Sequence, residues 1–127
     1  MEFYIPTETG ELLAFSAAAV TGLLGLFALF APRAALTLCG LQPREGGREG
    51  FAFARSAGGF HAGLALVALL FAQSWIYMAI GGGLALAAFG RILSMMSDGS
   101  FTMKNLAALL VQAALAGCML GYAFEFL

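Results

Sequence analysis

The sequence predicts an all-α integral membrane protein, folded as an antiparallel four-helix bundle with both termini on the outer side. The chain has 127 residues, of which 61% are hydrophobic and only 10% are charged. Soluble domains carry about 25% charged residues, so the composition is typical of a membrane protein. Four apolar segments approach or exceed the ~20 residues that a helix needs to cross a bilayer. Basic residues lie near the first and third connections between these segments and not near the second.

The four helices are expected in one domain, residues 1–127, at about residues 12–31, 51–72, 75–96 and 106–127. Pro6 and Thr7 precede the first helix, and Glu8 and Glu11 suit the positive end of its dipole. Pro32 ends that helix. The apolar residues after it alternate up to Gly40, which predicts a short interfacial turn before a polar loop.

Gln73 and Ser74 leave room for only a tight turn between the second and third helices. So short a connection predicts that these two helices are antiparallel neighbours. Asp98 and Gly99 end the third helix, and Gly99 suits a left-handed cap. Ser100 or Thr102 is expected to cap the fourth helix.

Small residues recur along every predicted helix. Glycines let helix backbones approach closely in membranes, where packing rather than water drives association. The glycines expected at helix contacts are Gly58, Gly59, Gly63, Gly83, Gly117 and Gly121.

The distribution of basic residues predicts the topology. They cluster around the first and third connections, at Arg33, Arg44, Arg48, Arg55, Arg91 and Lys104. The positive-inside rule therefore places these two connections in the cytoplasm and both termini outside. Four aromatic residues that favour the interface then fall at the outer side, namely Tyr4, Trp75, Tyr77 and Tyr122.

Polar residues within the apolar segments are the candidate ligand-binding residues. Such groups are costly in hydrocarbon and usually face protein or a cavity. Arg55 and Arg91 reach similar depths near the inner ends of the second and third helices, so we expect them to share one site. Their compensating partners would be Asp98, Glu49, Asn105, Gln112 or an anionic headgroup. The only histidine, His61, lies deeper, with Thr21 and Gln112 as possible partners.

Two short motifs resemble an uncharacterised bacterial membrane family, the domain of unknown function 4345. They are RSAGG at residues 55–59 and GR-x-x-S-x-x-x-DG at residues 90–99. The resemblance implies a four-helix protein of the bacterial inner membrane, but no activity. The family-like positions are Arg55, Gly58, Gly59, Arg91, Asp98 and Gly99.

These patterns favour an accessory or interaction subunit of a membrane assembly, bound to a larger complex or to itself. One alternative is a protein that binds an anionic lipid, quinone or other amphiphile at the inner leaflet, through Arg55 and Arg91. A further alternative is a pigment or haem ligated by His61. A small multidrug exporter would need an acid inside the membrane, and the acids lie near helix ends.

Other function classes are disfavoured. The formal net charge of −1 offers no basic surface for nucleic acid. No nucleophile–base pair or metal-ligand spacing occurs, so we expect neither catalytic residues nor a metal site. Cys39 and Cys118 have no partner spacing and are expected to be free thiols.

The predicted topology can be tested by labelling with a thiol reagent that does not cross membranes. In a background lacking Cys39 and Cys118, cysteines placed at Thr7 and Ser74 should react in intact cells, and one at Gly47 should not. Reaction at Gly47 would reverse the orientation.

Overall fold

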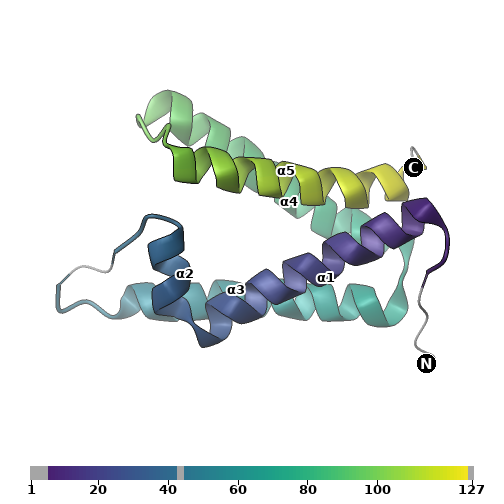
Figure 1. The fold of residues 1–127 in the computed structure, drawn as a ribbon, viewed down its shortest axis with the longest axis horizontal. Helices are drawn as coiled ribbons and strands as arrows, with labels where there is room; N and C mark the ends of the chain where they lie inside the picture. Colours follow the sequence, from purple (N-terminus) through teal and green to yellow (C-terminus); the bar gives the residue numbers. More distant parts are fainter. Residues whose placement is uncertain (1–5, 43–44, 126–127) are drawn as a thin grey trace.

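The computed structural model describes residues 6–42 and 45–125. Tyr4, Arg44 and the last two residues of the fourth predicted helix lie outside these ranges. The described chain is helical and contains no strand (Figure 1). Its helices are α1 (Thr9–Phe30), α2 (Pro32–Leu38), α3 (Glu49–Phe71), α4 (Ser74–Ser97) and α5 (Met103–Ala123). Within the described residues, α1, α3, α4 and α5 are long and apolar enough to cross a membrane.

The long helices occur where the sequence predicts them, with starts two or three residues earlier for α1, α3 and α5. The predicted cap of the last helix is confirmed at Thr102, whose Oγ1 accepts a hydrogen bond of 3.2 Å from the backbone N–H of Asn105. Gly99 has the predicted left-handed conformation, with φ of 68°. Local residue preferences therefore account for these helix ends.

The predicted interfacial turn after α1 is wrong, because residues Pro32–Leu38 form the short helix α2. Ala31 leaves the helical conformation, with φ of −131° and ψ of 61°, and Pro32 then occupies the first position of α2. Proline suits this position because its φ is already helical and its missing N–H would have had no partner. Pro32 therefore ends one helix and begins another.

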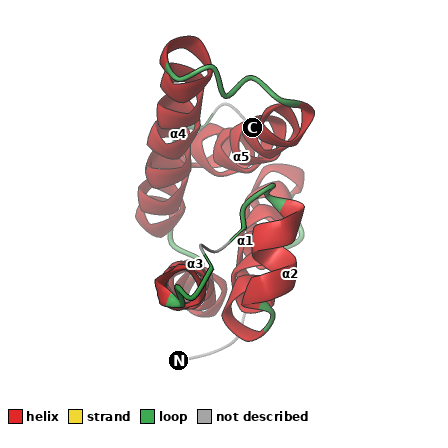
Figure 2. Cartoon of the chain, turned by 90° about the vertical axis from the view of Figure 1, so that its left-hand side faces the viewer, coloured by secondary structure: helices red, strands yellow, loops and turns green. Residues whose placement is uncertain are grey.

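The packing order of the long helices is α3–α1–α5–α4. Helix α1 packs against α3 and α5, and α4 packs against α5. Figure 2 shows α4 and α5 in one layer and α1, α2 and α3 in the other. The prediction that the second and third helices pack as neighbours is wrong beyond their turn, because α3 and α4 make few contacts. Gln73 and the left-handed Ala72 reverse the chain direction. The close helix contacts at glycines, however, join α1 to α3 and α4 to α5.

The two layers meet at the end of the molecule where α1 begins and α5 ends, and they separate toward α2 (Figure 1). The main apolar core lies where they meet and is rich in alanine. Tyr77 and Met119 are its largest fully buried side chains. The rings of Tyr77 and Tyr122 pack edge to face with centroids 5.6 Å apart. The core members are Ala14, Ala17, Ala18, Ala68, Ile76, Tyr77, Ile80, Leu84, Ala116 and Met119.

Helices α1 and α3 cross with their backbones in contact at Gly25 and Gly58. A Cβ atom added at Gly58 would clash with the carbonyl oxygen of Gly25 and would lie 2.7 Å from the backbone nitrogen of Leu29. A Cβ atom at Gly25 would lie 2.6 Å from the carbonyl oxygen of Gly58. Only glycine fits at both positions, since neither backbone can yield to a side chain.

The other predicted packing glycines differ from Gly58. A Cβ at Gly59 would meet only the Leu29 side chain, at 3.8 Å, and Gly63, Gly83 and Gly117 face open space in the described structure. Gly121 is half-buried near the end of α5. In the GGG run of α4 the contact residue is Gly81, where a Cβ would lie 2.8 Å from Leu120 Cγ. Spacing along one helix did not indicate which glycine faces a neighbour.

We predict that Gly58→Leu lowers the thermal unfolding midpoint strongly, because overpacking costs about 1–3 kcal/mol or more when backbone must move. Gly63→Leu is the matched control on the same helix, since its added side chain meets open space. Its midpoint should stay the same or rise slightly, given the better helix propensity of leucine. Equal losses in the two variants would show that the crossing does not depend on Gly58.

Candidate functional site

An open pocket of about 1040 Å³ lies beyond the end of α1, where α2, the start of α3 and the start of α5 come together. We call it the basic pocket. Its lining combines apolar residues with four cationic side chains. The lining residues are Phe30, Ala31, Pro32, Arg33, Ala34, Thr37, Leu38, Arg48, Phe51, Arg55 and Lys104.

Three of the four cations are held by specific contacts. Arg55 donates from Nη1 to the carbonyl oxygen of Leu29 at 2.7 Å, across the α1–α3 interface. The Arg33 guanidinium lies over the Phe51 ring, 4.9 Å from its centroid, in cation–π geometry.

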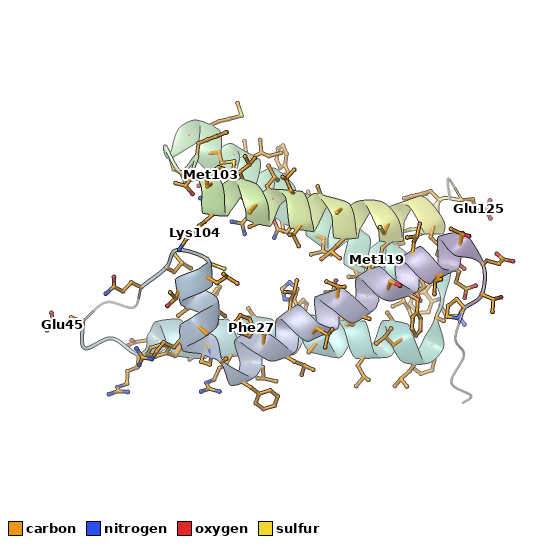
Figure 3. All side chains as sticks on the ribbon, in the orientation of Figure 1. Phe27, Glu45, Met103, Lys104, Met119 and Glu125 are labelled. Carbon is orange, nitrogen blue, oxygen red and sulfur yellow. The ribbon has the colours of Figure 1, made fainter. Side chains whose placement is uncertain are left out.

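Lys104 is the only described contribution of α5 to this pocket. Its Nζ donates to the carbonyl oxygen of Thr37 on α2 at 3.1 Å. Figure 3 shows the Lys104 side chain extending from the start of α5 toward α2. Both layers of the molecule therefore contribute charge to the same pocket.

The electrostatic balance of the basic pocket is one-sided. None of its described lining residues is acidic. Glu49 is next to Arg48 in the chain, but its carboxylate accepts the backbone N–H of Arg48 at 2.9 Å and lines a separate, smaller pocket. The four cationic side chains form no ion pair with any described residue, so the pocket retains an uncompensated positive charge.

Arg91 belongs to a different cluster, which ties α4 to α5. Its Nε donates to Gln112 Oε1 at 3.1 Å and its Nη1 donates to Asn105 Oδ1 at 2.8 Å. Asn105 in turn donates from Nδ2 to the carbonyl oxygen of Ser100 at 2.6 Å. Arg91, Gln112 and Asn105 are half-buried, and amide oxygens rather than carboxylates satisfy the guanidinium.

The predicted common site for Arg55 and Arg91 is therefore wrong. Arg55 is bonded within the α1–α3 pair, whereas Arg91 is bonded within the α4–α5 pair. The predicted pairing of Arg91 with Asp98 is also wrong, because the exposed Asp98 carboxylate has no ion pair or hydrogen bond with any described residue. The expected association of Arg91 with Gln112 and Asn105 is confirmed.

His61 is exposed on α3, and its Nδ1 lies 2.7 Å from the carbonyl oxygen of Ala57 one turn earlier. Because a carbonyl can only accept, this contact makes Nδ1 the donor. The partners expected from the sequence do not reach it. Thr21 donates to the carbonyl oxygen of Ala17 at 2.9 Å, and Gln112 is bonded to Arg91.

In the sequence, Arg33, Arg48 and Lys104 served to predict the topology, and they were not expected to share a site. Their common position near the helix ends that the charge pattern predicts to be cytoplasmic was a usable signal, since residues at the same membrane depth can converge. Helix rotation and the packing order decide which of them meet, and neither follows from the basic-residue count.

Comparisons with protein-family models, curated proteins and solved structures gave no match. The resemblance to the domain of unknown function 4345 therefore stays a prediction.

The Arg91 cluster predicts a specific pattern of stability. Gln112→Ala should lower the unfolding free energy by about 0.5–2 kcal/mol, the range measured for side-chain hydrogen bonds between membrane helices. Asp98→Asn should change it by less than about 0.5 kcal/mol, as expected for an exposed residue without a partner. A double-mutant cycle of Arg91→Ala with Gln112→Ala should give a favourable coupling. Additive effects would contradict the Nε–Oε1 hydrogen bond.

Proposed function

We propose that this protein is a multi-pass membrane protein that binds an anionic amphiphile in the basic pocket. The observation that carries the proposal is the convergence of four cationic side chains, from several segments, on one pocket without a described acidic residue. The positive-inside rule places this end of the protein at the inner leaflet, where anionic lipid headgroups are available.

The pocket has two properties that suit an amphiphile. Arg33, Arg48, Arg55 and Lys104 supply hydrogen-bond donors for phosphate or carboxylate oxygens. Phe30, Leu38 and Phe51 supply apolar surface beside these donors. Cations that are already held by Leu29, Phe51 and Thr37 lose less conformational freedom when a ligand binds.

The other two functions remain predictions. An accessory role in a membrane assembly agrees with the open faces at Gly63, Gly83 and Gly117, but these are equally suited to lipid. A pigment or haem would be held by Nε2 of His61, the ring nitrogen that makes no hydrogen bond with the described residues. We favour amphiphile binding because four cationic side chains converge in the basic pocket without a described acidic residue.

We predict that the purified protein retains phosphatidylglycerol in preference to phosphatidylcholine when both are titrated in mild detergent and bound lipid is counted by native mass spectrometry. The triple variant Arg33→Gln, Arg48→Gln, Arg55→Gln should bind phosphatidylglycerol roughly a hundredfold more weakly, because each basic residue near a membrane surface contributes about 1 kcal/mol.

Arg91→Gln is the control for loss of a single positive charge elsewhere, since it removes one guanidinium that lies outside the basic pocket. Arg91→Gln should keep the lipid preference of the parent protein even if the variant unfolds at a lower temperature. The proposal fails if the parent protein shows no preference, or if Arg91→Gln and the triple variant lose the same affinity per charge removed.

A further inference from the structure

Two of the four cations of the basic pocket are placed at different levels of α2. Arg33 lies in the first turn of α2 and is held against Phe51. The Lys104 ammonium is bonded to the carbonyl oxygen of Thr37, four residues later on the same helix. The pocket therefore carries cationic groups on both sides, the arginines from the α1–α2–α3 layer and Lys104 from α5, which we take as two anion positions.

We infer that the ligand of the basic pocket is a lipid whose headgroup carries two phosphate groups. This inference rests on the proposed function and specifies its ligand. One phosphate contacts the arginines of the α1–α2–α3 layer, and the other contacts Lys104 of α5. A bis-phosphodiester lipid and an isoprenyl diphosphate share this chemistry.

Charge balance supports two phosphates over one. A single phosphodiester carries one negative charge and would leave most of the positive charge of the four cations uncompensated. Each cation also keeps spare donors, because Arg55 uses one of five N–H groups on Leu29 and Lys104 uses one of three on Thr37. A second phosphate binds these donors without breaking either contact.

Size and apolarity support a lipid over a free ion. The volume of about 1040 Å³ slightly exceeds the roughly 300–1,000 Å³ range of small-molecule sites and is far more than inorganic phosphate occupies. Phe30, Leu38 and Phe51 line the same pocket and would remain exposed beside a free anion. An attached hydrocarbon chain covers them.

The test compares four probes by native mass spectrometry of the full chain in mild detergent: phosphatidylglycerol, cardiolipin, farnesyl diphosphate and inorganic diphosphate. At least one of the two lipidic bis-phosphates should bind roughly fivefold more tightly than phosphatidylglycerol, given one added cation contact near a membrane surface. Whichever of the two binds more tightly identifies the source. Inorganic diphosphate should bind more weakly than both.

Lys104→Gln should weaken the binding of the lipidic bis-phosphates more than that of phosphatidylglycerol and so remove this preference, and Lys104→Arg should restore it. The rescue variant separates a lost phosphate contact from a lost fold. Equal affinities for phosphatidylglycerol and both bis-phosphates would overturn the inference and leave the proposed function intact. If the protein showed no preference for any anionic lipid, the inference and the proposed function would both be overturned. If inorganic diphosphate bound as tightly as the lipids, the ligand would not need a hydrocarbon chain, and the inference of a lipid would be overturned.

Discussion

The backbone contact between Gly25 and Gly58 is the constraint on which the candidate site depends. It sets the separation of α1 and α3, because neither position accommodates a Cβ atom. Leu29 is one turn after Gly25, and Arg55 is nearly one turn before Gly58, so the crossing brings the Arg55 guanidinium to the Leu29 carbonyl oxygen at 2.7 Å. A wider crossing would move Arg55 away from the end of α1. The apolar interior of one helix pair thus positions a charge at the edge of the basic pocket.

Local features of the fold were predictable from the sequence, and the packing was not. Apolar length located the four long helices, and cap preferences located Thr102 and Gly99, because these signals act within a few residues. The order α3–α1–α5–α4 depends on which small residues face each other. Every helix carries several, so Gly58 and Gly81 could not be distinguished from Gly63 and Gly83. Pro32 was recognised as the end of one helix, but its equal suitability for starting α2 was missed.

In the candidate site, too, some contacts were predictable from the sequence and others depended on the packing of the helices. Membrane depth correctly brought Arg91 to Gln112 and Asn105, which lie on the helix that directly follows α4. The similar predicted membrane depth of Arg55 and Arg91 wrongly indicated a shared site, since two charges at the same depth can lie in different layers. Asp98 appeared to be the natural partner of Arg91 by charge, yet the amide oxygens of α5 satisfy the guanidinium instead. An amide partner leaves the positive charge in place, whereas a carboxylate would neutralise it.

The alanine-rich core and the basic pocket lie at opposite ends of the molecule, and this separation gives Lys104 its importance. The layers are held together by the core around Tyr77 and Met119, while toward α2 they diverge (Figure 1). There the Lys104–Thr37 hydrogen bond links α5 to the other layer. A single hydrogen bond to a backbone carbonyl contributes about 1 kcal/mol, much less than a buried core. An anion held by both Lys104 and the arginines would strengthen this link, so ligand binding and the approach of the two layers are energetically coupled.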